Sequence, residues 1–306
     1  MTVHYTVDGR VATVRIDRPE VLNALDRATL DGIADGFRKA SADHHVGVVV
    51  LTGTGDRAFC SGADLDEQAA FVERPNDYWA WMGHFIAAVD AIRTSAKPVV
   101  ARLNGMTVGG GNELNLACDL AVAADDIVLR HVGPSRGSLP AGGATQWMPI
   151  VVGDRRAREV LLLNQPVPVT QALAWGWVNR VVPRAELDAA VDEVCRELLA
   201  KMPEIVRATR AQLDFWKDLS WAMTIRMARE WLTVHAGSEE VVEGLASFHE
   251  KRAIDYERLR TSTENAGAGR RCTSCGHRSL DPDARYCARC GAAVEEATVA
   301  QEIHDA

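Results

Sequence analysis

The chain has 306 residues, 47% of them hydrophobic and 25% charged, which suits one large soluble domain with a small appendage. Its formal net charge of −8 argues against nucleic acid as the main partner. There is no apolar run of about 18 residues, and the first ten residues lack the apolar core of a signal peptide. We therefore expect a cytoplasmic protein with no membrane partner.

The first elements predicted are two strands, residues 3–7 and 11–16, which alternate around a hairpin turn at Asp8-Gly9. A helix is expected to begin near Asn23–Asp26, because apolar residues then recur at helical spacing. These apolar residues are Leu30, Ile33, Ala34 and Phe37.

Two later strands each lead into a loop of small residues. The strand predicted at Val46–Leu51 is followed by Ser61-Gly62-Ala63-Asp64, and the strand at Pro98–Leu103 by Gly109-Gly110-Gly111. A helix is predicted from Asn112, with Glu113 in its first turn. A glycine turn at a helix N-terminus directs free N–H groups and a positive dipole end at one point, which favours an anion or oxyanion site. The alternative is a structural turn in which Glu113 complements the helix dipole.

Between these loops, residues 66–96 include a predicted helix rich in aromatic and other apolar side chains. Its apolar residues are Tyr78, Trp79, Trp81, Met82, Phe85, Ile86 and Val89. Such a stripe is typical of a packed core.

Four segments carry a resemblance to a known family. They are Arg18–Leu25 (RPEVLNAL), Ala58–Leu65 (AFCSGADL), Asn104–Asp125 (NGMTVGGGNELNLACDLAVAAD) and Gly137–Pro149 (GSLPAGGATQWMP). In this order they resemble the crotonase (enoyl-CoA hydratase/isomerase) superfamily over about residues 3–258. The resemblance implies an α/β fold with a ββα spiral core, and an acyl-CoA thioester as substrate.

By motif position, the resemblance gives the backbone N–H groups of Ala63 and Gly110 the role of an oxyanion hole for the thioester oxygen. Glu113 matches one of the two catalytic glutamates of hydratases, and Asp64 and His131 are further catalytic candidates. The positions expected to contact the substrate or its CoA moiety are Asn23, Ser61, Ala63, Leu65, Gly109, Gly110, Phe248 and Lys251. The aromatic helix would line the acyl pocket.

The chain departs from the hydratase pattern at Gly133, which occupies the position of the second glutamate. Gln146 joins Asp64 and His131 as a possible replacement. The stretch Gly133–Gly153 (GPSRGSLPAGGATQWMPIVVG) resembles the 6-oxocyclohex-1-ene-1-carbonyl-CoA hydrolases, which open a cyclic oxo-acyl ring with water. Water addition to an enoyl-CoA and hydrolytic ring opening are therefore both candidates. A single-base isomerase or dehydratase, or a non-catalytic acyl-CoA-binding protein, is the alternative.

The predicted organisation is a spiral core (residues 1–190), a helical trimerisation region (191–260), a linker (261–269), a zinc ribbon (270–293) and a disordered tail (294–306). Two helices are predicted at Ala185–Lys201 and Pro203–Leu219, the second begun by its proline. The family habit implies a homotrimer or hexamer.

The C-terminal segment carries two CxxCG knuckles, with eleven residues between Cys275 and Cys287. Their cysteines, Cys272, Cys275, Cys287 and Cys290, predict a tetrahedral structural zinc site of four thiolates. The chain has seven cysteines, and this odd number supports metal binding rather than disulfides. With a net charge near +1 including the metal, the ribbon is expected to dock a protein partner rather than nucleic acid.

Overall fold

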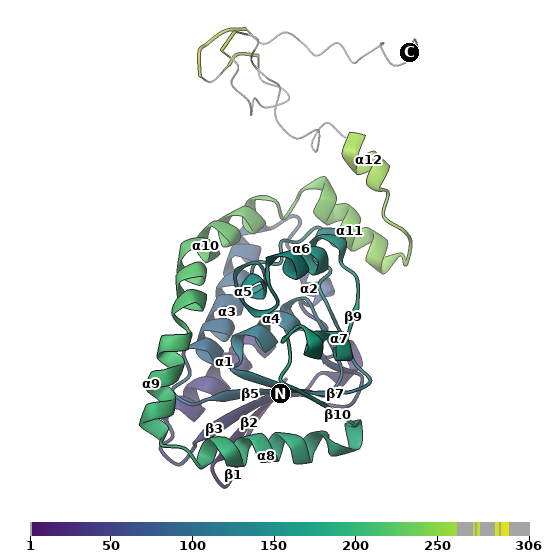
Figure 1. Cartoon of the computed structure of the whole chain (residues 1–306). Helices are drawn as coiled ribbons and strands as arrows, with labels where there is room; N and C mark the ends of the chain where they lie inside the picture. The colour runs from purple at the N-terminus through teal and green to yellow at the C-terminus, as the bar shows by residue number, and fades with distance from the viewer. Residues whose placement is uncertain (1, 262–271, 273, 276–284, 288, 294–306) are drawn as a thin grey trace.

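The computed structural model describes residues 2–261, 272, 274–275, 285–287 and 289–293 (Figure 1). Its strands form two sheets. The larger sheet has, side by side, β1 (Val3–Asp8), β2 (Val11–Ile16), β3 (Val48–Gly53), β5 (Val99–Leu103), β7 (Leu120–Ala124) and β10 (Arg180–Val182). The smaller sheet has β4 (Ala58–Cys60), β6 (Met106–Val108), β8 (Val128–Arg130) and β9 (Val167–Pro168).

Consecutive strands alternate between the two sheets. The chain passes from β3 to β4, from β5 to β6 and from β7 to β8, each time crossing from the larger sheet to the smaller one. Helices follow the first two of these pairs, so the chain repeats a ββα unit. Within each sheet the repeated strands run parallel. This arrangement confirms the predicted α/β spiral and brings the ends of β4, β6 and β8 to one edge.

The helices are α1 (Arg27–Ala42), α2 (Leu65–Ala69), α3 (Pro75–Arg93), α4 (Gly110–Ala117), α5 (Ala144–Val151), α6 (Asp154–Leu163), α7 (Val169–Ala174), α8 (Leu187–Leu199), α9 (Pro203–Leu213), α10 (Phe215–Val234), α11 (Glu239–His249) and α12 (Tyr256–Thr261). Three short 3₁₀ turns lie at Pro19–Val21, Gly133–Ser135 and Arg184–Glu186.

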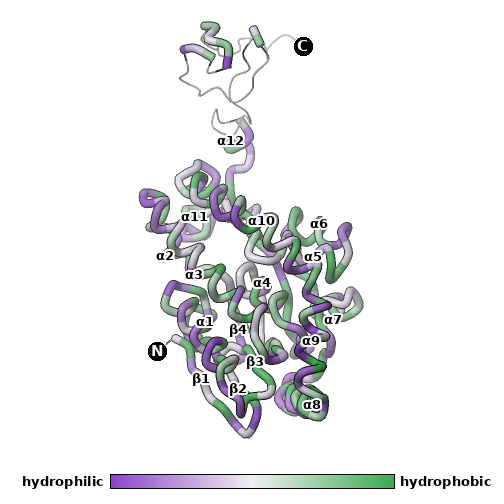
Figure 2. The backbone as a smooth tube through the Cα atoms, turned by 90° about the vertical axis from the view of Figure 1, so that its left-hand side faces the viewer, coloured by the Kyte–Doolittle hydropathy of each residue, from purple (hydrophilic) through white to green (hydrophobic). Residues whose placement is uncertain are grey.

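The sequence explains the central elements. Every residue of β3 is buried, as expected for a parallel strand covered on both faces. The α1 helix begins after Asp26, whose side chain accepts a hydrogen bond from the Thr29 N–H at 2.7 Å. Helix α8, which lies beside the larger sheet, is amphipathic, because hydrophobic and hydrophilic residues both occur along it (Figure 2). It buries Leu187 and Val191.

The predicted helix at Pro203–Leu219 is wrong in extent, because α9 ends at Leu213 and α10 begins at Phe215. Each segment is anchored separately. On α9, the Arg210 guanidinium donates to the Asp119 carboxylate at 2.6 Å, while the Trp147 indole donates to the Lys217 carbonyl of α10 at 3.1 Å. These partners lie far away in sequence, so local spacing could not locate the break.

Several large apolar side chains of α9 and α10 are exposed. They include Ile205, Leu213, Phe215, Trp216, Met223, Met227 and Val234, and Met202, directly before α9, is exposed as well. An apolar surface of this kind is typical of a subunit interface, and trimerisation through this region stays a prediction. Among the described residues, no helix combines the length and apolar character needed to cross a bilayer. The linker beyond Thr261 and the predicted tail lie outside the described residues.

Candidate active site

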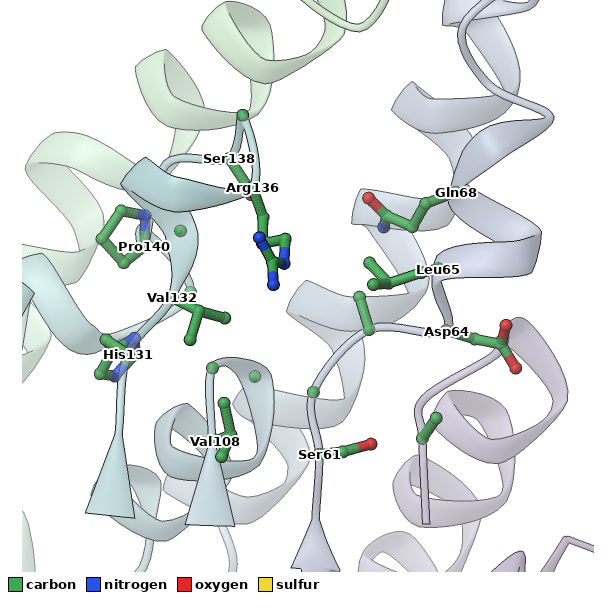
Figure 3. A pocket seen from close by; sticks show the side chains of 18 of the residues that line it. Ser61, Asp64, Leu65, Gln68, Val108, His131, Val132, Arg136, Ser138 and Pro140 are labelled. Carbon is green, nitrogen blue, oxygen red and sulfur yellow. The ribbon is translucent and has the colours of Figure 1, made fainter. Parts of the chain in front are cut away.

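Three loops meet at one edge of the smaller sheet, because β4, β6 and β8 are parallel neighbours there. Figure 3 shows the three strands ending side by side, with Ser61, Val108 and His131 at their ends. The loop after β4 runs through Asp64, the loop after β6 is the glycine turn, and the third loop follows β8. Carboxyl ends of parallel strands commonly form ligand sites, and a cavity of about 600 Å³ lies here.

The first two loops are in contact. A methyl group added to Gly110 would lie 3.6 Å from the Gly62 Cα atom. The Leu25 N–H donates to the Gly62 carbonyl at 2.8 Å, and the Asp64 N–H donates to the Leu25 carbonyl at 3.0 Å. The N–H of Ala63, between them, donates no hydrogen bond within the described part of the chain.

The N–H of Gly110 is likewise without an acceptor among the described residues, since Gly110 is the first residue of α4. Glycines make this approach possible. Gly109 has a φ of 54°, and a methyl group on Gly111 would lie 2.3 Å from the Cys60 carbonyl oxygen. Two free donors and the positive end of a helix can together hold an oxygen on which negative charge develops.

One buried carboxyl group, that of Glu113, also lines this cavity. Only 6% of Glu113 is exposed, and its Oε1 accepts hydrogen bonds from the N–H groups of Gly142 at 2.7 Å and Ala144 at 3.3 Å. Burial outweighs these two hydrogen bonds and raises the pKa of Glu113 to about 8. Near neutral pH this group can therefore accept and donate a proton.

The wall beside Glu113 is aromatic. Phe71 stacks on Tyr78 with ring centroids 5.5 Å apart, and Trp81 stacks on Phe85 at 5.6 Å. All four side chains line the cavity, and Met82 lies among them. Three of the four rings belong to α3, as the sequence predicted, and they provide an apolar surface for an acyl group.

Comparison with known proteins gives the family of this chain. A sequence model described as enoyl-CoA hydratase/isomerase matches residues 6–259. The chain belongs to this family. The predicted crotonase resemblance is thereby confirmed, whereas the ring-opening subgroup stays a prediction.

Solved structures of this family resemble the chain over nearly their whole length. The enoyl-CoA hydratase from Mycobacterium avium subsp. paratuberculosis K-10 shares 30% identity at a TM-score of 0.76, over 83% of this chain and 98% of that one. The enoyl-CoA hydratase from Bacillus anthracis shares 26% identity at a TM-score of 0.68, again over 83% and 98%. The one from Bacillus halodurans, at 21% identity and a TM-score of 0.76 over 81% and 100%, shows the shared fold.

His131 is one of the two further catalytic candidates predicted beside Glu113. It is buried and lies directly after β8. Its Nε2 lies 2.7 Å from the Asn112 amide nitrogen, and the Asn112 oxygen accepts from the Trp177 indole at 3.1 Å. Since an indole only donates, the amide nitrogen of Asn112 faces the imidazole and donates to it. Burial lowers the pKa of His131 to about 3, so the ring stays neutral at physiological pH.

Asp64, the other of these candidates, lies at the cavity wall but has its oxygens engaged. Its Oδ1 accepts from the N–H groups of Asp66 at 3.1 Å and Glu67 at 3.3 Å, which begins α2. Its Oδ2 pairs with Arg18 at 2.9 Å. In Figure 3 the carboxylate of Asp64 points away from the centre of the cavity. This geometry is that of a structural carboxylate.

The residues predicted to contact the substrate divide into two groups. Those that line the cavity are Ser61, Ala63, Leu65, Gly109, Gly110 and Phe248. Asn23 and Lys251 are not among the residues that line it. The Asn23 side chain instead donates to the Ala58 carbonyl at 2.8 Å and accepts from the Arg18 N–H at 3.0 Å, which fixes the turn before α1. Gln146 similarly donates to the Ala141 carbonyl at 2.8 Å, away from the cavity lining.

Gly133, at the position of the second glutamate, lies in a tight turn that leaves no room for a side chain. A methyl group added to Gly133 would lie 2.6 Å from the Ser138 carbonyl oxygen. A carboxylate side chain at this position would therefore require the backbone to shift. Among the described residues that line the cavity, Glu113 is the acidic residue that is buried.

Sequence reasoning missed several polar residues of the cavity wall, among them Gln68, Arg136 and Ser138. Arg57 and Arg130 also line it. Ser138 lies within the GSLP segment that carried the family resemblance, which was an available signal. The direction of the Gln68 and Arg136 side chains, shown in Figure 3, had no signal in the local sequence.

The four predicted zinc ligands lie together, with all their sulfur atoms within 4.8 Å of one another. The Cys272 and Cys290 sulfurs are 3.6 Å apart, and those of Cys275 and Cys287 are 3.8 Å apart. A tetrahedral zinc ion with Zn–S bonds of about 2.3 Å requires sulfurs about 3.8 Å apart. The Arg289 N–H also donates to the Cys287 sulfur, as in a metal knuckle. The donor set therefore fits zinc.

Proposed function

We propose that this protein is an acyl-CoA enzyme that stabilises a thioester enolate. The observation that carries the proposal is the combination of two free backbone N–H groups with one buried carboxyl group in a mainly apolar cavity. The N–H groups of Ala63 and Gly110 hold the thioester oxygen, and Glu113 transfers the proton. Asp64 and His131 take positioning roles, Asp64 by fixing the loop of Ala63 and His131 by bonding to α4.

Glu113 can perform each proton transfer of a hydration. As a carboxylate it accepts a proton from water while the water oxygen bonds to the β carbon, and the electron pair of the double bond moves to the thioester oxygen. The protonated Glu113 then donates to the α carbon of the enolate. In ring opening, Glu113 instead accepts a proton from water as the water oxygen bonds to the carbon of a ring ketone. The bond from this carbon to the α carbon then breaks, its electron pair passes into the thioester enolate, a carboxylic acid forms, and the protonated Glu113 donates its proton to the α carbon.

The lack of a second carboxyl group at Gly133 supports reactions that need a single proton-transfer residue. Hydrolytic opening of a cyclic oxo-acyl-CoA is one of these, and isomerisation of an enoyl-CoA or dehydration is another. A non-catalytic acyl-CoA-binding protein is the remaining alternative, and the raised pKa of Glu113 argues against it, since proton-transfer groups are commonly tuned in this way.

Mass spectrometry of thioester products tests the proposal. The panel contains crotonyl-CoA, a cyclic alkenoyl-CoA and a cyclic 6-oxo-acyl-CoA, with free CoA monitored as a control for thioester hydrolysis. We expect at least one thioester to gain the mass of one water, or to change its double-bond position and so its chromatographic retention time at unchanged mass, without release of CoA. Water uptake by the cyclic ketone alone identifies ring opening. If none of the thioesters is converted, the proposed catalysis is contradicted, and a non-catalytic acyl-CoA-binding protein is the remaining alternative.

We also propose that the four cysteines hold one structural zinc ion per chain. Thiolates occupy all four tetrahedral positions, so no position is open for a substrate. Within the described residues of this short segment, the buried hydrophobic cluster consists of Cys272 and Cys287, with Ala292 packed against it. The folding of the segment is therefore expected to depend on the metal.

Metal analysis of the purified chain is expected to give one zinc per chain. Changing Cys275 and Cys290 together to serine should reduce zinc content to less than about a tenth, because two of four ligands are lost. Cys195→Ala, which alters a buried cysteine outside the cluster, is the matched control and should keep its zinc. Zinc content that is equal in the double variant and the control contradicts the assignment.

A further inference from the structure

Arg136 places a positive charge inside the proposed acyl-CoA cavity. Figure 3 shows its guanidinium extending from the loop after β8 into the cavity, between Val132 on one side and Leu65 and Gln68 on the other. Its side chain is half-buried and lines the cavity. The guanidinium is thus positioned to meet a bound molecule.

This guanidinium has no acidic partner among the described residues. Its Nη1 donates a hydrogen bond to the Ser135 carbonyl at 2.8 Å, and its central carbon lies 5.5 Å from the centroid of the Phe248 ring. Two other partly buried arginines, Arg102 and Arg210, each pair with a carboxylate at 2.7 or 2.6 Å. Arg130, which also lines the cavity, instead donates to the Asn164 carbonyl at 2.7 Å. A guanidinium without a counter-ion in a partly buried cavity favours an anionic ligand.

The loop that carries Arg136 is firmly held. The N–H groups of Arg136 and Ser138 both donate to the Gly133 carbonyl, at 2.8 and 2.9 Å. On the other side, the loop packs on α11 so closely that a methyl group on Gly244 would lie 2.5 Å from the Arg136 carbonyl carbon. The guanidinium is therefore presented from a fixed backbone, which lowers the entropic cost of binding a ligand.

Other polar side chains line the cavity together with Arg136, namely those of Gln68, Tyr78 and Ser138. These four side chains supply polar hydrogen atoms to the cavity that also contains Glu113. None of these four side chains carries a negative charge at neutral pH, so an oxygen-rich group is favoured there.

We propose that Arg136 binds a carboxylate on the acyl group, so that this enzyme acts on an acyl-CoA that carries a second acidic function. The inference rests on the proposed function, because it uses the same cavity. A guanidinium binds a carboxylate through two parallel N–H donors, which an alkyl chain cannot replace. The CoA phosphates are the competing anion, and the experiment separates the two.

Binding of unreactive saturated thioesters by titration calorimetry tests this inference. The probes are carboxyacyl-CoAs from malonyl- to adipoyl-CoA, the alkanoyl-CoAs from butyryl- to heptanoyl-CoA, and free CoA. We expect the best carboxyacyl-CoA to bind the native enzyme about 10- to 100-fold more tightly than the best alkanoyl-CoA, as for a hydrogen bond to a charged group. Arg136→Met should remove this preference and leave alkanoyl-CoA affinity within about threefold.

Two further variants make the result interpretable. Arg136→Lys keeps the positive charge but lacks the two parallel N–H donors of the guanidinium, so it should retain part of the preference for carboxyacyl-CoAs. Arg158→Gln removes an exposed arginine of α6 and should retain all of it. Equal binding of carboxyacyl- and alkanoyl-CoAs by the native enzyme overturns the inference alone, whereas failure of all thioesters to bind overturns the proposed function as well. An equal loss of affinity for all probes and free CoA in Arg136→Met assigns the residue to a CoA phosphate instead.

Discussion

Replacing Glu113 by glutamine is expected to lower kcat by about 10²- to 10⁴-fold while changing the Kd of a bound thioester by less than about threefold. The amide oxygen of glutamine can still accept from the Gly142 and Ala144 N–H groups, so the local contacts are kept. An amide cannot transfer a proton at neutral pH, so the chemical step is lost. Steady-state kinetics and calorimetric titration measure the two effects separately.

The same assignment fixes the pH dependence of the native enzyme. Burial raises the pKa of Glu113 to about 8, and the base that activates water is the carboxylate. As pH rises toward 8 the carboxylate fraction grows, so kcat/KM should increase about tenfold per pH unit below 8 and level off above it. Glu159→Gln, an exposed carboxylate on α6, is the control and should keep both kcat and this profile. A near-normal kcat in Glu113→Gln contradicts the assignment.

Local patterns predicted part of the framework of the site. The buried strands β3 and β5 and the helix at the glycine turn are specified by residues close in sequence. The short strands β4, β6 and β8, which lead directly into the three loops, were not predicted, because runs of three residues carry little periodicity. The meeting of the loops also follows from topology, because β4 and β6 are parallel neighbours and their carboxyl ends lie together. The structure begins α4 at Gly110 rather than at Asn112, which adds the N–H of Gly110 to the free donors of the helix.

Side-chain direction was much harder to predict. An aspartate one residue before a helix can cap it or face a ligand, and Asp64 caps α2. Asn23 similarly closes its own turn. Arg136, in a loop of small and polar residues, resembles a surface arginine in sequence, yet its loop is set by Gly244 of α11, more than 100 residues later. The directions of these side chains are decided by packing between segments far apart in the sequence, which local sequence patterns do not reveal.

The backbone donor of the oxyanion hole can be removed at Gly110 by proline. Proline lacks the N–H group and is well tolerated at the first position of a helix, which Gly110 occupies. Gly110→Ala is the matched control, because it adds the same Cβ atom and keeps the N–H group. This Cβ would lie 3.1 Å from Phe85 and 3.2 Å from Leu25, both side-chain contacts that can adjust slightly.

We expect Gly110→Pro to turn over at saturating thioester about 10²- to 10³-fold more slowly than Gly110→Ala, the usual effect of losing one oxyanion donor. Gly110→Ala should stay within about tenfold of the native enzyme, and thermal melting should show both variants folded. Both variants carry the same added Cβ, whereas only proline lacks the hydrogen and places its Cδ atom where that hydrogen was. Equal rates in the two variants would mean that the negative charge of the reaction develops away from Gly110, and the enolate mechanism would then have to be abandoned.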